Sequence, residues 1–228
     1  MLINEFIFFL QVFVVLIFAF ASLRIGKEAL CTWVTLQAIL ANLFVLKQID
    51  LCGFTVTCSD VFAIGSILGL NLLQEYFGKK TAVKTAWISF FFMLFFGLMS
   101  QIHLLFNPSP DDYSQSAFVI LLSPAPRLLL ASLIVFVIVQ QFDLRFYGLL
   151  KKIPGNLPLS YRNFLSLSVS QFIDTVLFSF LGLYGVVASL FDVVFISFLL
   201  KVVITLCISA CLFFSKRLIP LQDHHESL

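Results

Sequence analysis

Predominantly apolar runs, each long enough to cross a lipid bilayer, dominate this 228-residue chain. A helix needs about 20 apolar residues to span the hydrocarbon core, and charged or proline-containing segments separate seven runs of that order. The chain is 61% hydrophobic and only 11% charged, which is too apolar for a fold whose surface faces water. We therefore predict an all-α fold, a polytopic integral membrane helical bundle. Its seven expected spans are 6–23, 29–46, 54–76, 85–106, 127–147, 164–183 and 188–214.

The segments between these spans favour a single membrane domain. Proline lacks a backbone N–H and ends helices, and all seven prolines fall outside the predicted spans. The longest connection, residues 107–126, is too short to hold a soluble domain. We expect one helical transmembrane domain over residues 1–220 and a short polar C-terminal tail over residues 221–228.

Basic residues predict the orientation of the bundle, because cytoplasmic loops are enriched in Lys and Arg. Eleven of the 14 basic residues would lie on the side that holds the C-terminus, which is therefore expected in the cytoplasm. A cleaved signal peptide is an alternative for the first span, since Ala19-Phe20-Ala21 resembles a cleavage site. However, no basic residue precedes that apolar run and Glu5 lies there instead. We expect a retained helix with its N-terminus outside.

Charge, cysteine content and missing motifs argue against several other classes of protein. The formal net charge of +2 is too small to suggest a nucleic-acid partner. The five cysteines have no metal-binding spacing and suggest no disulfide framework, so we expect no metal and no cofactor. The sequence contains neither a nucleotide-binding loop of the G-x4-G-K-S/T type nor a catalytic constellation, so we do not expect an enzyme.

Polar side chains inside the predicted spans are the strongest functional signal. A charge near the bilayer centre costs about 2.5–3.5 kcal/mol on insertion scales, so such groups need a partner, a water-filled cavity or a ligand. Asp60 lies in the third span and Lys201 in the last. Three amide–carboxylate pairs, each sharing a helix face, are Asn71 with Glu75, Gln140 with Asp143, and Gln171 with Asp174. We predict that these pairs and Lys201 line one polar cavity.

An amide beside a carboxylate can match the edge of a guanine-like base, and carboxylates also suit a cationic amine. The many aromatic side chains could stack on a planar ring. Two simpler interpretations stay open: the amides could only join helices by hydrogen bonds, and Lys201 could only neutralise Asp143 or Asp174. Gly65 and Gly69, four residues apart, are typical of close helix packing.

Several short motifs, in order and at matching spacing, resemble those of the queuosine precursor transporters, also called the vitamin uptake transporter (VUT) family. Two are continuous: ANLFVLKQI at residues 41–49 and NLLQEYFGKKTA at residues 71–82. The pattern R-x4-S-x7-Q-x2-D is matched by Arg127, Ser132, Gln140 and Asp143. The pattern RN-x2-S-x4-Q-x2-D is matched by Arg162, Asn163, Ser166, Gln171 and Asp174. The similarity runs from about residue 26 to residue 217, so a six-helix family core would follow one N-terminal helix.

The resemblance implies import of 7-deazaguanine bases, which are precursors of the tRNA nucleoside queuosine: the nitrile base, the aminomethyl base or queuine. It implies a multi-pass protein of the bacterial inner membrane. Its partners would be the lipid bilayer and the small-molecule substrate, and no nucleic-acid partner is expected. Formation of a homodimer stays an open alternative. The residues expected to bind substrate are Asn42, Lys47, Asn71, Glu75, Arg127, Gln140, Asp143, Gln171, Asp174 and Lys201.

Within this set, Asp143 and Asp174 would hold the base, and Glu75 would close the cytoplasmic side or carry a coupled proton. Two positions depart from the family pattern. Asn71 replaces the usual acid of the third span, and Ser197 replaces an acid often found four residues before Lys201. The second departure favours pairing of Lys201 with Asp143 or Asp174.

Three other functions stay open. A substrate-binding membrane subunit of an ATP-driven vitamin or nucleobase importer would fit the size of the chain. A lipid-modifying membrane enzyme would need catalytic motifs that the sequence lacks. A purely structural bundle would leave the surplus carboxylates without a role.

Overall fold

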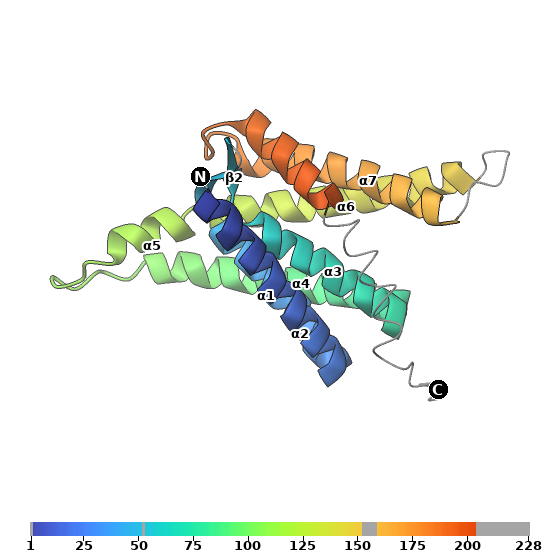
Figure 1. The fold of residues 1–228 in the computed structure, drawn as a ribbon. Helices are drawn as coiled ribbons and strands as arrows, with labels where there is room; N and C mark the ends of the chain where they lie inside the picture. The colour runs from blue at the N-terminus through green and yellow to red at the C-terminus, as the bar shows by residue number, and fades with distance from the viewer. Residues whose placement is uncertain (1, 52, 152–158, 204–228) are drawn as a thin grey trace.

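Helices form most of the fold in a computed structural model that describes residues 2–51, 53–151 and 159–203 (Figure 1). A further helix covers residues 190–203 and is called helix 190–203 below. In chain order the other elements are α1 (Leu2–Ile25), α2 (Lys27–Phe44), β1 (Gln48–Leu51), β2 (Phe54–Thr57), α3 (Asp60–Phe77), α4 (Lys79–Leu104), α5 (Gln115–Leu122), α6 (Ala125–Lys151), α7 (Leu159–Phe178) and a π-helical turn (Ser179–Leu183).

The all-α prediction is wrong at one place, because β1 and β2 form an antiparallel hairpin. The third span was expected to begin at residue 54, but α3 begins at Asp60. Residues 55–57 are all β-branched, a pattern that favours a strand, and Gly53 adopts φ +86° at the turn. The Asn4 side-chain amide of α1 donates to the Asp50 carbonyl over 3.0 Å, which ties the hairpin to the N-terminal end of α1 (Figure 1).

The structure supports part of the predicted set of membrane spans. Three described helical stretches are long and apolar enough to cross a membrane: Ile3–Ile25, Lys79–Leu104 and Gln115–Val139. The third includes α5, which lies in a segment that was predicted to be only a connection. Helices also lie at the other predicted spans, but the count of seven stays a prediction. Residues 204–214 of the last predicted span and the polar tail lie outside the described residues.

The two glycines of the Gly65-x-x-x-Gly69 motif bring α3 close to α2, as the sequence predicted. A Cβ atom added at Gly69 would lie 2.4 Å from Val34 Cγ2. One added at Gly65 would lie 2.6 Å from Gln37 Oε1 and 2.9 Å from Val15 Cγ1 of α1. Real Cβ atoms do not approach neighbours so closely, so only glycine permits this separation of the three helices.

We expect Gly69→Ala to destabilise the protein, because its new methyl group would overlap Val34. Overpacking of this kind costs about 1–3 kcal/mol, and the thermal unfolding midpoint in detergent should fall by several degrees. Gly182→Ala is the matched control, since its added Cβ would come no nearer than 3.3 Å to the Phe178 ring. Equal midpoints for the two variants would contradict this account of α2–α3 packing.

Candidate functional site

A partly buried ion pair joins helix 190–203 to α7. The Lys201 ammonium lies 2.8 Å from Asp174 Oδ2 and donates to Thr175 Oγ1 over 3.0 Å. The Lys201 side chain is 9% exposed, whereas the Asp174 side chain is 33% exposed. Of the two carboxylates expected to pair with Lys201, Asp174 is therefore confirmed. Because Asp174 is the more exposed partner, its carboxylate can also receive a ligand.

A second carboxylate reaches the same helix from α3. Asp60 is 5% exposed, and its Oδ2 accepts a hydrogen bond from the Ser197 hydroxyl over 2.8 Å. Ser197 precedes Lys201 by one helical turn, so both side chains lie on one face of helix 190–203. Our sequence analysis noted Asp60 as a buried acid but missed it as a site residue. The available signal in the sequence was that Ser197 lies four residues before Lys201. Nothing in the local sequence connected these two residues to α3.

The described part of this cluster holds more negative than positive groups. Asp60 and Asp174 are carboxylates, whereas Lys201 supplies one ammonium. Asp60 makes no ion pair with any residue that the structure describes. Buried charges are usually paired and hydrogen-bonded, so Asp60, which has one described hydroxyl donor, could accept a further hydrogen bond.

Gln171 adds an unused acceptor beside Asp174, as the predicted Gln-x-x-Asp pairing requires. The side-chain oxygen Oε1 of Gln171 is buried and has no hydrogen-bond partner among the described residues. Its backbone carbonyl accepts from the Thr175 hydroxyl over 2.8 Å, which fixes the oxygen that Lys201 contacts. An unsatisfied buried acceptor is rare in native proteins. Gln171 Oε1 and the Asp174 carboxylate could together receive two N–H donors of a ligand.

The pair on α3 lies at the opposite end of that helix from Asp60. Asn71 is half-buried and Glu75 is exposed. Fifteen residues separate Glu75 from Asp60, which corresponds to about 22 Å along a helix axis. The described contacts therefore do not join Asn71 and Glu75 to the Lys201 cluster. The side chains of Gln140 and Asp143, on α6, are not among those that the structure describes.

The other three candidates lie apart from the Lys201 cluster in their described contacts. The Asn42 amide donates to the Ala38 carbonyl over 2.9 Å and to Met93 Sδ over 3.2 Å. Asn42 Oδ1 is buried without a partner among the described residues. Lys47 is exposed just before the hairpin.

Arg127, in the first turn of α6, contacts the π-helical turn that follows α7. Its Nε donates to the Leu181 carbonyl over 3.1 Å, and its Nη2 donates to the Tyr184 carbonyl over 2.8 Å. The guanidinium therefore satisfies two carbonyls at the end of the π-helical turn, which would otherwise lack donors. The expected contact of Arg127 with substrate stays a prediction.

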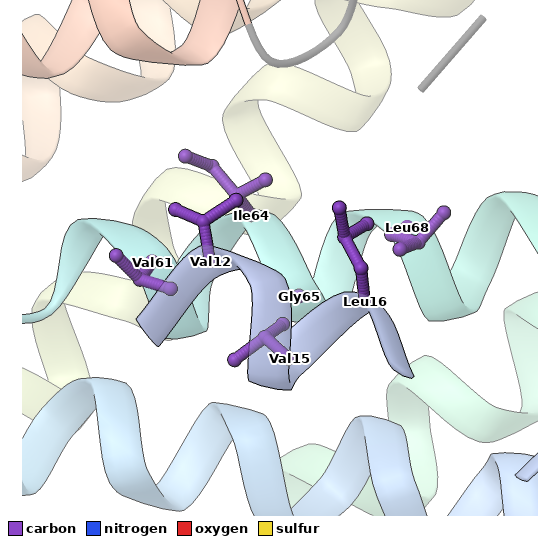
Figure 2. A pocket seen from close by; sticks show the side chains of 7 residues that line it. All are labelled: Val12, Val15, Leu16, Val61, Ile64, Gly65 and Leu68. Carbon is purple, nitrogen blue, oxygen red and sulfur yellow. The ribbon is translucent and has the colours of Figure 1, made fainter. Parts of the chain in front are cut away.

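A hollow between α1 and α3 does not serve as the site (Figure 2). Its volume of about 10 Å³ is near the minimum for one water molecule. The residues that line it are all apolar: Val12, Val15, Leu16, Val61, Ile64, Gly65 and Leu68. A planar polar ligand would find neither space nor hydrogen-bonding groups there, so this hollow is a gap in helix packing. Among the described residues, no group of three or more His, Cys, Asp or Glu side chains could hold a metal ion.

Comparisons with known proteins give one family and one named relative. Residues 57–214 match the family described as "Putative vitamin uptake transporter". The chain is 33% identical over 207 residues to the "Probable queuosine precursor transporter" of Bacillus subtilis (strain 168). The alignment covers 89% of this chain and 89% of that protein. No solved structure is significantly similar to the chain.

We expect Arg127→Lys to lower the thermal unfolding midpoint in detergent, although the substitution keeps the positive charge. A lysine cannot present the guanidinium fork that bonds two separate carbonyls, and the loss of such hydrogen bonds costs about 1 kcal/mol each. Lys47→Gln, at an exposed position, is the control. A wild-type midpoint for Arg127→Lys would show that the two carbonyl contacts do not stabilise the fold.

Proposed function

Because the chain belongs to the vitamin uptake transporter family, we propose that it imports queuosine precursors. The proposed substrates are 7-deazaguanine bases: the nitrile base, the aminomethyl base and queuine. The protein is a helical membrane protein, and we place it in the bacterial inner membrane with a cytoplasmic C-terminus. A relative named as a queuosine precursor transporter, aligned over 89% of both chains, supports this assignment.

The main structural support for this proposal is the set of side chains formed by Gln171, Asp174 and Lys201. It offers two acceptors beside an ammonium donor. A guanine-like edge presents the complementary set, because its ring N–H and exocyclic NH₂ lie beside a carbonyl oxygen. Asp174 would accept from the N–H groups and Lys201 would donate to the carbonyl. The exposure of Asp174 supports direct contact with the ligand.

The proposed mechanism is alternating access around this row. The substrate would take over part of the hydrogen bonding that Lys201 now gives to Asp174, so the ion pair would loosen when the site is filled. Asp143 and Gln140 of α6 would hold the other face of the base. Asn42, Lys47 and Arg127 would line the entrance, and Asn71 and Glu75 would act near the cytoplasmic opening.

We expect Asp174→Asn to abolish uptake of labelled 7-deazaguanine bases in cells that lack their own carrier. The amide cannot supply two acceptors and removes the ion pair between Lys201 and Asp174, and lost charge-assisted contacts of this kind cost about 1.5–3 kcal/mol each. That cost corresponds to a decrease in affinity of roughly 10- to 100-fold. Asp192→Asn, on helix 190–203 but outside the cluster, should transport normally.

Protein abundance in the membrane must be equal for both variants. Full-rate uptake by Asp174→Asn would exclude the proposed substrate contact. Absence of uptake by the wild-type protein, for all three bases, would exclude the proposed substrates.

The alternative is a substrate-binding membrane subunit of an ATP-driven importer. We expect the purified chain to transport the bases into lipid vesicles without ATP and without another protein, since a secondary transporter needs no ATP-hydrolysing subunit. Uptake only after addition of an ATP-hydrolysing partner would favour the alternative. Vesicles that contain the Asp174→Asn variant control for leakage.

A further inference from the structure

One face of α4 is exposed over most of its length, and its chemistry changes from one end to the other. Residues three or four positions apart share a helix face. The exposed residues of this face, in chain order, are Lys80, Lys84, Trp87, Phe91, Leu94 and Leu98. Because α4 is long and apolar enough to cross a membrane, this row of side chains meets the bilayer. It is called the α4 lipid face below.

The charged end of the α4 lipid face has no acid beside it. The ammonium groups of Lys80 and Lys84 make no ion pair with any residue that the structure describes. The first turn of α4 contains no Asp or Glu, and Lys79 adds a third exposed cation next to Lys80. Neighbouring cations repel one another, and an anion between them relieves that repulsion. This end of the face is therefore complementary in charge to a negatively charged group.

Trp87 lies between the charged and the apolar part of the face. Its side chain is half exposed, and its ring packs edge-on against Phe136 of α6 at a centroid distance of 5.9 Å. Tryptophan is enriched at the membrane–water interface, where its ring meets apolar groups and its N–H meets polar ones. Lys84 and Lys80 precede Trp87 by about 5 and 10 Å along the helix axis. Their ammonium groups are therefore at the depth of lipid headgroups.

Beyond Trp87 the same face is apolar for the length of one lipid tail. Eleven residues separate Trp87 from Leu98, which corresponds to about 16 Å of helix and to half of the roughly 30 Å hydrocarbon core. Phe91 is 66% exposed, and Leu94 and Leu98 are 55% and 57% exposed. Cationic, interfacial and apolar groups thus follow one another in the order of the phosphate, the ester groups and the acyl chain of a phospholipid.

We propose that the α4 lipid face binds an anionic phospholipid, whose phosphate pairs with Lys80 and Lys84. The acyl chain lies along the apolar part of the face, and the Trp87 indole N–H donates to an oxygen between headgroup and tail. A zwitterionic lipid has the same tail, but its own cation offsets its phosphate, so the lysines select a lipid of negative net charge. This site does not depend on which substrate the protein carries.

Fluorescence of Trp87 provides the test, because the chain has only two tryptophans. The full-length Trp33→Phe variant, in phosphatidylcholine vesicles, leaves Trp87 as its one indole. Brominated phosphatidylglycerol or brominated phosphatidylcholine is then titrated in, since bromine quenches an indole that it contacts. We expect half-quenching at a mole fraction at least about fivefold lower for phosphatidylglycerol, which is the preference that one lysine near an anionic headgroup supplies. Equal quenching by the two lipids overturns the proposal.

Removal of the two cations should remove this preference. In the Trp33→Phe background, Lys80→Gln/Lys84→Gln should be quenched equally by both brominated lipids, and high salt should weaken the preference of the protein that keeps its lysines. A preference for phosphatidylglycerol that survives the double substitution shows that other groups hold the lipid, and it overturns the assignment of the site to these lysines.

Lys27→Gln is the matched control for Lys84→Gln, because each removes one cation at the same end of the bundle. Cys31 of α2 contacts Thr85 of α4, and Lys27 lies one helical turn before Cys31. Lys27 is paired with Glu28 at 3.6 Å, so its loss should leave the lipid preference unchanged, whereas Lys84→Gln should reduce it severalfold. Equal reductions by the two variants overturn the proposal, because they indicate only a general effect of net charge.

A second measurement keeps both tryptophans, in case Trp33→Phe does not fold. Phosphatidylglycerol added to the unchanged protein in detergent should raise its thermal unfolding midpoint more than phosphatidylcholine with the same acyl chains. Lys80→Gln/Lys84→Gln should lose that difference. An equal rise with both lipids in the unchanged protein contradicts a site for an anionic phospholipid.

Discussion

The ammonium of Lys201, buried where three helices meet, is the constraint on which this arrangement depends. An isolated ammonium in an apolar interior is costly, so helix 190–203 must lie where a carboxylate can reach it. Asp174 and Thr175 of α7 meet that need directly. One turn earlier, Ser197 bonds Asp60 of α3. The same polar contacts therefore position helix 190–203 and hold the side chains that are candidates for binding a ligand.

Close packing between helices holds several of them in fixed positions relative to one another. Gly65 and Gly69 allow α3 to lie against α1 and α2, and the hairpin joins the end of α2 to the start of α3. Arg127 joins α6 to the π-helical turn after α7 through two carbonyls. Dense apolar packing of this kind does not deform continuously.

Recognition of a ligand's hydrogen-bonding edge and balance of the site's charge are two different tasks for this site. Gln171 and Asp174 offer acceptors, and Lys201 offers a donor. A neutral guanine-like edge satisfies all three groups without adding charge, while a cationic amine would in addition offset the surplus carboxylate. Under the proposed function, neutral and cationic 7-deazaguanine bases would both meet acceptors and a donor in this set.

The sequence by itself determined the helical membrane class, the family and most helix positions, because apolar run length and proline placement are local properties. It also identified the Gly65–Gly69 packing face and the Gln171–Asp174 pair, which depend on helical periodicity alone. It could not identify the hairpin as such, since its apolar residues extend the run that forms α3. It left Lys201 with two candidate partners and overlooked Asp60, because which helices adjoin helix 190–203 is a long-range property. Only the tertiary structure decided that α3 and α7 both reach that helix, and the physical reason is that a buried ammonium takes its partners from whichever helices packing brings beside it.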